Sequence, residues 1–122
     1  MDKSILVVDD DDTVRSLIVD YLVEQGYLVY DAADGPNALQ ILEREHPALM
    51  LLDLRLIKMS GLDVLKKVEK ISSSTVVVIL TGLQDETLAK EAIRLGAYDY
   101  INKPISFDKL QANILNRIFD HD

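Results

Sequence analysis

Groups that could carry phosphoryl chemistry stand at the ends of short apolar runs in this sequence. Four consecutive aspartates, Asp9–Asp12, follow the first run, and Asp53 follows the third. The Thr81 hydroxyl follows the fourth run and the Lys103 ammonium follows the fifth. Carboxylates with no His or Cys beside them are the donors that hard divalent cations prefer. The set therefore suits a metal-assisted reaction of a phosphoryl group.

Convergence of Asp9, Asp10 and Asp53 would require a cation. Two carboxylates about 4 Å apart repel by about 4 kcal/mol at an effective dielectric constant of about 20. The single positive charge of Lys103 would not balance three carboxylates, so the cluster would keep a net negative charge. A divalent cation would neutralise it, and an all-oxygen site favours Mg²⁺ or, alternatively, Mn²⁺.

With a metal in place, Asp53 could act as a nucleophile towards phosphorus, as in aspartyl-phosphate enzymes. Lys103 and the Thr81 hydroxyl would then hold the transferred phosphoryl oxygens. The sequence offers neither a dedicated general base for rapid hydrolysis nor a Gly-rich loop of the Walker type. It therefore predicts phosphoryl acceptance, not rapid turnover.

Five apolar runs must position these groups. They are near-continuous and rich in Val, Ile and Leu, which is typical of strands buried on both faces. We expect the second, the weakest, at or near an edge of the sheet. The predicted strands are Ile5–Val8, Leu28–Tyr30, Ala48–Leu52, Thr75–Leu80 and Tyr98–Ile101.

Amphipathic segments with helical periodicity alternate with the strands. The predicted helices lie around Val14–Leu22, Ala38–Leu42, Leu62–Val68, Leu88–Leu95 and Phe107–Ile118. Their predicted stops are Gly26, Pro47 and Gly96. Their predicted N-terminal caps are Asp11 or Asp12, Ser60, Asp85 and Ser106. Asp31 and Asp34 are expected in a looser turn, and Arg15 and Arg55 are expected to be solvated charges.

The alternation predicts a (βα)5 fold, a three-layer α/β domain with helices on both faces of a parallel sheet. The 122 residues suffice for a single domain, residues 1–122, with no room for a second core. In such sheets, ligands bind at the carboxyl ends of the strands. The acidic groups, the hydroxyl and the lysine would all meet at that edge.

Composition excludes several other classes. The chain has no Cys and two His, which excludes disulfide and thiolate chemistry and disfavours a histidine metal site. A net charge of −8 would repel phosphate backbones, so we expect no direct nucleic-acid binding. Neither a signal peptide nor a membrane span is evident, and we expect a cytoplasmic protein.

Taken together, the motifs closely resemble the receiver domain of two-component response regulators. The resemblance runs from Lys3 to about Phe119, and it implies a flavodoxin-like three-layer sandwich with strand order 2-1-3-4-5. The motifs that carry it are Ile5-Leu6-Val7-Val8-Asp9-Asp10, Leu51-Leu52-Asp53, Leu80-Thr81-Gly82, Gly96-Ala97 and Lys103-Pro104.

The resemblance implies that Asp53 accepts a phosphoryl group from a phosphohistidine of a sensor histidine kinase or phosphotransfer protein. It implies that Asp10 binds Mg²⁺ directly and that Asp9 binds it through water. The backbone carbonyl of Arg55 would supply a further metal ligand. The chain would be a phosphoacceptor signalling domain that catalyses only its own phosphorylation and slow dephosphorylation, rather than an enzyme.

The resemblance also implies a conformational switch. Thr81 would move towards the phosphoryl group, Lys103 would pair with it, and the ring of Tyr100 would turn inward. The Lys103–Pro104 bond is expected to be cis. The face made by the fourth helix, fifth strand and fifth helix would then change its preference for an output domain or protein partner, or alternatively form a phosphorylation-dependent homodimer.

Three positions depart from the family pattern or tune it. Ile57 stands where relatives usually have proline, which removes a rigid bend from the loop after Asp53. Arg55 and Leu83 lie two residues after Asp53 and Thr81, at positions that tune the lifetime of the phosphoryl group in relatives. The sequence predicts no rate from this pair.

Two rival functions share the architecture. A Mg²⁺-dependent aspartate-nucleophile phosphatase of the haloacid-dehalogenase type needs a second Asp two residues after the nucleophile, where this chain has Arg55. A flavin-binding module needs a Ser/Thr/Gly-rich phosphate loop after the first strand, where this chain has Asp9–Asp12. The sequence leaves open whether the chain works alone or is the receiver of a longer regulator.

Overall fold

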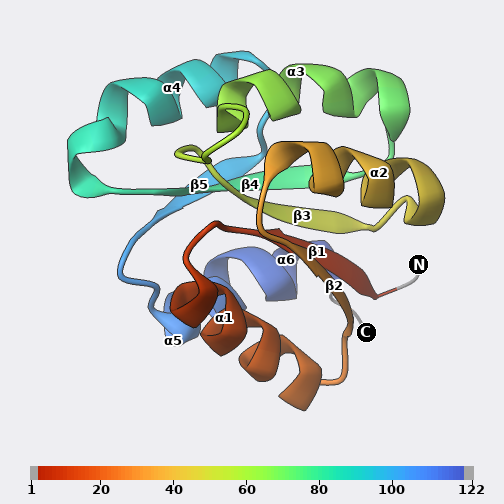
Figure 1. Ribbon diagram of the computed structural model, residues 1–122. Helices are drawn as coiled ribbons and strands as arrows, with labels where there is room; N and C mark the ends of the chain where they lie inside the picture. The colour runs from red at the N-terminus through yellow and green to blue at the C-terminus, as the bar shows by residue number, and fades with distance from the viewer. Residues whose placement is uncertain (1–2, 120–122) are drawn as a thin grey trace.

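A five-stranded parallel sheet forms the centre of the protein in a computed structural model that describes residues 3–119 (Figure 1). The strands lie side by side in the order β2-β1-β3-β4-β5. This confirms the predicted order and places β2 at an edge. The strands are β1 Ser4–Val8, β2 Leu28–Ala32, β3 Leu49–Asp53, β4 Val76–Thr81 and β5 Asp99–Asn102.

Helices connect the strands as predicted. They are α1 Asp12–Glu24, α2 Gly35–Glu45, α3 Gly61–Ile71 and α4 Glu86–Arg94, with a short 3₁₀ turn, η1 Leu83–Asp85, before α4. The C-terminal helix consists of α5 Phe107–Lys109, the π-helical segment η2 Leu110–Leu115 and α6 Asn116–Phe119. Over residues 3–119, no helix has both the length and the apolar character needed to cross a bilayer.

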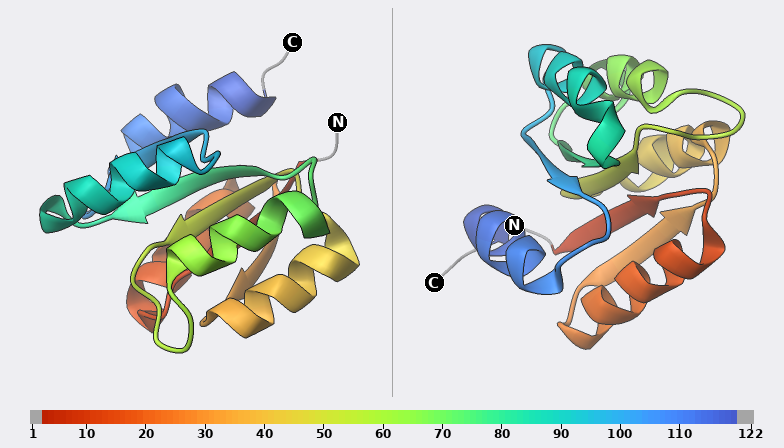
Figure 2. Two further views of the ribbon diagram at one scale, coloured as in Figure 1. Left: turned by 90° about the horizontal axis from the view of Figure 1, so that it is seen from above. Right: turned by 90° about the vertical axis from the view of Figure 1, so that its left-hand side faces the viewer.

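Alternation along the buried strands divides the core into two layers. Leu6 and Val8 of β1 face the layer formed with α2, α3 and α4. Ile5 and Val7 face the layer formed with α1 and the C-terminal helix. The two sets of helices lie on opposite faces of the sheet (Figure 1 and Figure 2). Burial on both faces explains why β1 and β3 read as continuous apolar runs.

Most predicted helix boundaries are confirmed. The Asp11 carboxylate caps α1 by accepting hydrogen bonds from two backbone N–H groups of its first turn. The hydroxyls of Ser60 and Ser106 each accept one hydrogen bond, from the backbone N–H of Asp63 in α3 and of Lys109 in α5. Gly26 and Gly96 follow α1 and α4 with φ of +96° and +113°, values that glycine adopts at little cost.

The end of α2 differs in detail from the expectation. The helix ends at Glu45, and His46 takes a left-handed conformation (φ +46°) before Pro47. The reversal thus occurs at His46, and Pro47 follows it. At the other end of α2, Asp34 accepts a hydrogen bond from the N–H of Asn37 (2.9 Å), so it is a helix cap and not part of a loose turn.

The prediction for Asp85 is wrong in its physical role. Asp85 stands at the start of α4, but its carboxylate makes no capping hydrogen bond to the helix. It points instead to the side chain of Arg55. The ionic partner is available because the β3–α3 loop lies next to the β4–α4 loop, a proximity that the local sequence of α4 does not reveal.

Candidate functional site

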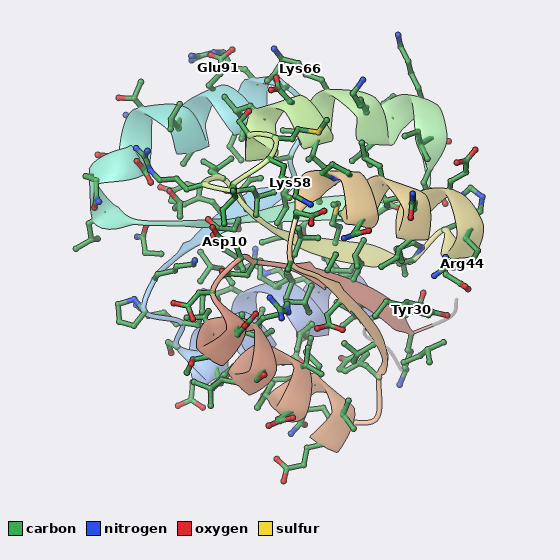
Figure 3. The ribbon with its side chains drawn as sticks, viewed as in Figure 1. Asp10, Tyr30, Arg44, Lys58, Lys66 and Glu91 are labelled. Atoms are coloured by element: carbon green, nitrogen blue, oxygen red, sulfur yellow. The ribbon has the colours of Figure 1, made fainter. Side chains whose placement is uncertain are left out.

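Three aspartates converge at the carboxyl ends of β1 and β3, which are neighbouring strands. Asp9 and Asp10 follow β1, and Asp53 is the last residue of β3. The strand β3 thus ends one residue later than predicted. Each offers a carboxylate oxygen, and these oxygens all lie within 4.8 Å of one another. Asp9 and Asp53 are buried, whereas Asp10 is half-buried at the rim (Figure 3).

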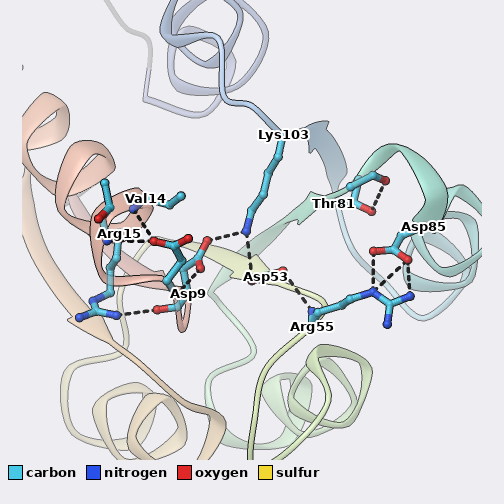
Figure 4. Close-up of polar contacts among 11 residues, drawn as sticks. Asp9, Val14, Arg15, Asp53, Arg55, Thr81, Asp85 and Lys103 are labelled. Atoms are coloured by element: carbon cyan, nitrogen blue, oxygen red, sulfur yellow. Dashed lines mark hydrogen bonds and ion pairs between the residues drawn. The ribbon is translucent and has the colours of Figure 1, made fainter.

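Lys103 bridges the two buried carboxylates. Its Nζ lies 2.8 Å from Asp9 Oδ2 and 3.1 Å from Asp53 Oδ2 (Figure 4). The backbone holds the residue in place, because its N–H donates to the Thr81 carbonyl oxygen at 2.8 Å. The peptide bond to Pro104 is cis, as predicted. The loop after β5 thus directs the ammonium into the acidic cluster.

Burial raises the pKa of Asp53 above its ordinary value, and repulsion from Asp9 raises it further. The N–H of Arg55 and the Lys103 ammonium oppose this increase without cancelling it. Burial alone would lower the pKa of Lys103, but its contacts with Asp9 and Asp53 outweigh burial and raise it. The lysine therefore stays charged, and the cluster holds more negative charge than one ammonium balances.

The residues fit a hard divalent cation. Asp9 Oδ2 is buried and has no hydrogen bond from the described residues, although it is paired electrostatically with Lys103. The other oxygen, Oδ1, accepts from the N–H of Asp11 at 2.9 Å. A buried carboxylate oxygen with spare acceptor capacity, next to two further carboxylates, is a donor set suited to Mg²⁺.

Arg15 supports the acidic loop, which corrects the expectation that it is a solvated charge. It donates to the Asp9 carbonyl oxygen at 2.7 Å, to Asp12 Oδ1 at 2.7 Å and to Asp31 Oδ2 at 3.0 Å. Its side chain is only 15% exposed. The spacing of three residues between Asp12 and Arg15 on one helix predicts their ion pair. The contact of Arg15 with Asp31 on β2 cannot be predicted from the local sequence.

The β3–α3 loop folds tightly around Asp53 despite Ile57 at the usual proline position. Asp53 Oδ1 accepts a hydrogen bond from the N–H of Arg55 at 3.0 Å. The N–H of Gly61 donates to the Leu54 carbonyl oxygen at 2.9 Å, which closes the loop. Ile57 itself is 78% exposed. Backbone hydrogen bonds therefore hold the bend that a proline would otherwise favour.

The Arg55 side chain is largely exposed, as predicted for a solvated charge, but it also forms an ion pair that the sequence did not predict. Its Nε donates to both carboxylate oxygens of Asp85, at 2.9 and 3.1 Å, and its Nη2 donates to Oδ1 at 2.5 Å. The hydrogen bonds from Arg55 hold the pKa of Asp85 below its ordinary value. The ligand role of the Arg55 carbonyl oxygen stays a prediction.

Thr81 and Tyr100 lie on the two neighbouring strands beside the cluster. Thr81, the last residue of β4, is buried, and its hydroxyl donates to the Gly82 carbonyl oxygen at 3.3 Å. Tyr100 on β5 pairs in register with Ile79 of β4 and packs against the core layer of α4. It also lines a surface hollow with Leu83 and Lys109. Their coupled movement stays a prediction.

Fold and site together define a flavodoxin-like α/β domain with an acidic cluster at the carboxyl ends of its parallel strands. Residues 5–115 match the response regulator receiver domain family. The chain belongs to this family, the receiver domains of two-component response regulators, and the resemblance seen in the sequence is confirmed.

Curated relatives include both short and long proteins. Sporulation initiation phosphotransferase F of Bacillus subtilis is 33% identical over 91% of this chain and 90% of its own length. Probable transcriptional regulator ycf27 of Porphyridium aerugineum is 41% identical over 92% of this chain but 46% of its own length. The chain thus spans about half the length, or less, of several curated relatives that it matches.

A solved structure of a response regulator from Burkholderia pseudomallei also shares the fold. It contains a phosphorylated aspartic acid, a calcium ion and citrate. It superposes with a TM-score of 0.85 at 27% identity, covering 97% of this chain and 67% of that one.

Proposed function

We propose that this chain is a phosphorylation-controlled switch whose Asp53 accepts a phosphoryl group in a Mg²⁺-dependent reaction. The observation that carries the proposal is the Asp53 carboxylate, buried beside two further aspartates with Lys103 Nζ 3.1 Å away. Two relatives support it: one is named a phosphotransferase, and the other is a response regulator with a phosphorylated aspartic acid.

In this reaction, an Asp53 carboxylate oxygen forms a bond to phosphorus while the bond from phosphorus to the donor imidazole breaks. The donor is a phosphohistidine of a sensor histidine kinase or phosphotransfer protein. Asp10, Asp9 and Asp53, with the Arg55 carbonyl oxygen, would hold Mg²⁺ or Mn²⁺, which supplies charge neutralisation. Lys103 and the Thr81 hydroxyl hold the phosphoryl oxygens after transfer.

Signalling follows from the movement of Thr81 towards the phosphoryl group. Tyr100 then turns inward, and the face of α4, β5 and the C-terminal helix changes its preference for an output domain or partner. A phosphorylation-dependent homodimer is a second use of that face. The setting is cytoplasmic, with the chain acting alone or as the receiver of a longer regulator.

A phosphatase is the weaker reading. Its acid–base aspartate would occupy the position of Arg55, whose guanidinium is paired with Asp85. The guanidinium stays protonated at neutral pH. It therefore cannot donate a proton to a leaving group and then act as the base that activates water. The domain is therefore expected to catalyse only its own phosphorylation and slow dephosphorylation.

Intact-mass measurement after incubation with acetyl phosphate and Mg²⁺ tests the proposal. We expect one added phosphoryl group on the unmodified chain and none on Asp53→Asn or after EDTA treatment. Circular dichroism of each sample establishes that it is folded. An unchanged mass of the folded chain, or stoichiometric modification of Asp53→Asn, would overturn the assignment.

A further inference from the structure

The ion pair of Arg55 and Asp85 joins two loops next to the acidic cluster of Asp9, Asp10 and Asp53. Arg55 lies in the β3–α3 loop, two residues after Asp53, and Asp85 ends the η1 turn that leads into α4. Three hydrogen bonds connect the guanidinium to the two carboxylate oxygens. In Figure 4, the Arg55 side chain extends from the end of β3 across to Asp85.

Burial of the two partners is strongly unequal. The Asp85 side chain is 4% exposed, whereas the Arg55 side chain is 66% exposed. Among residues 3–119, Arg55 is the one cation within ion-pair distance of Asp85. The carboxylate is therefore buried beneath this one counter-ion of the described residues, and the outer side of the guanidinium is exposed and can take another partner.

Both partners are connected to the groups proposed to react and to switch. The backbone N–H of Arg55 donates to Asp53 Oδ1, so the residue that carries the guanidinium is anchored to the acceptor. The N–H of Asp85 donates to the Gly82 carbonyl oxygen at 3.0 Å, and the Thr81 hydroxyl donates to the same oxygen. Asp85 thus shares a tight turn with Thr81.

We propose that Asp85 is a positioning residue that holds the Arg55 guanidinium away from Asp53 in the unphosphorylated protein, and that a phosphoryl group on Asp53 competes for this guanidinium. The competition rests on the proposed function. A phosphoryl group carries about −1.5 to −2 charges and three acceptor oxygens, and arginine binds phosphate through two hydrogen bonds.

Loss of the guanidinium changes the start of α4. A buried carboxylate without a counter-ion is unstable in a low-dielectric environment, so Asp85 must reach water when Arg55 leaves. Departure of Arg55 uncovers the carboxylate and removes the link between the η1 turn and the β3–α3 loop, so the η1 turn and the first turn of α4 open more readily. Phosphorylation thus loosens this segment through Arg55 and Asp85, in addition to any movement of Thr81.

Hydrogen–deuterium exchange of residues 82–88 tests this link, with Asp85→Asn and Arg55→Gln as variants. Arg55→Gln changes an exposed side chain and keeps the backbone carbonyl, so it should fold even if Asp85→Asn does not. Glu91→Gln is the matched control, because it removes a carboxylate from an exposed ion pair with Arg94 on the same helix. Glu91 lies on α4, away from Asp10 of the acidic cluster (Figure 3).

We expect both variants to exchange about tenfold faster than the unmodified chain in this segment before phosphorylation, because local opening governs amide exchange. Acetyl phosphate and Mg²⁺ should accelerate exchange in the unmodified chain and in Glu91→Gln, but add little in Arg55→Gln. In Arg55→Gln, phosphorylation should therefore no longer accelerate exchange, which is what competition for Arg55 predicts. A purely structural ion pair would change only the exchange rate before phosphorylation.

Two results would overturn the inference. Unchanged baseline exchange in Arg55→Gln would show that the pair does not hold the segment. If phosphorylation, verified by the added mass, accelerates exchange in Arg55→Gln as much as in the unmodified chain, no competition for Arg55 occurs. If the unmodified chain gains no mass, the proposed function fails and the competition fails with it, whereas the baseline comparison still decides whether the pair restrains α4.

Discussion

At the scale of single residues, the arrangement of the acidic cluster depends on the ammonium group of Lys103. Lys103 contacts the buried carboxylates of Asp9 and Asp53, and its side chain is 25% exposed. The ammonium offsets part of the repulsion between the two carboxylates. Its position is set by the backbone hydrogen bond to Thr81, so the lysine combines a structural and a chemical role.

Replacement of Lys103 by glutamine should therefore lower stability. Loss of the ammonium leaves the buried Asp9 carboxylate without a charged partner, and we expect the free energy of unfolding to fall by about 1–3 kcal/mol. Urea denaturation without divalent cations measures the change. Lys66→Gln, on the outer face of α3 (Figure 3), should change stability by less than about 0.5 kcal/mol. Equal losses in the two variants would contradict the role of Lys103.

Asp85 should add a specific acid dependence. Hydrogen bonds from Arg55 lower its folded-state pKa, so the folded protein binds fewer protons here than the unfolded chain. The contribution of Asp85 is complete above the unfolded pKa of about 3.9 and is lost as pH falls through the folded pKa. The stability advantage of the unmodified chain over Asp85→Asn should shrink below about pH 4. Parallel denaturation series at several pH values test this, and a constant difference would refute it.

At the scale of elements, the connection between β3 and α3 depends on close backbone approach at Gly61. A Cβ atom at this position would lie 2.5 Å from the Asp53 carbonyl oxygen and 2.6 Å from Leu54 Cα. Both contacts are with backbone atoms, so no side-chain rotation can relieve them. The glycine allows α3 to begin directly against the end of β3 and so fixes the loop that carries Arg55.

Gly61→Ala should consequently destabilise the protein and disturb the site. We expect a loss of about 1–3 kcal/mol, typical of overpacking against a rigid neighbour, together with slower phosphorylation by acetyl phosphate. Gly82→Ala is the matched control, because its Cβ would meet only side-chain atoms, the nearest at 3.3 Å. Thermal unfolding and initial rates of mass increase measure the two effects. Similar behaviour of both variants would argue against this account of Gly61.

At the scale of the whole molecule, the sheet couples the acidic site to overall stability. The three aspartates lie at the ends of the two most buried strands, β1 and β3. Repulsion in the cluster therefore opposes folding of the centre of the protein. A cation that binds only the folded arrangement would stabilise the entire domain by mass action.

Mg²⁺ should raise the thermal unfolding midpoint. At a concentration one hundred times its dissociation constant, binding adds about 2.7 kcal/mol to the free energy of unfolding. Differential scanning calorimetry with Mg²⁺, against NaCl at equal ionic strength, measures the shift. Asp10→Asn should reduce it strongly. Asp11→Asn should retain most of it, because Asp11 caps α1. A shift that persists in Asp10→Asn would exclude the proposed ligand set.

The sequence by itself determined the alternation of strands and helices and the edge at which the reactive groups meet. These follow from local periodicity and from the rule that ligands bind at the carboxyl ends of parallel strands. The sequence therefore predicts that Asp9, Asp10, Asp53 and Lys103 lie together. Resemblance to the receiver family supplied the strand order and the individual roles.

Only the tertiary structure decided the partners of the long charged side chains. Arg55 and Asp85 are 30 positions apart, and Arg15 and Asp31 are 16 apart. A charged side chain in a loop has several acceptors within reach, and its choice depends on how neighbouring loops fold against each other. Local sequence patterns predict helices and strands because the burial of side chains repeats along each of them with a fixed period. An ion pair between two loops leaves no such repeat in the sequence.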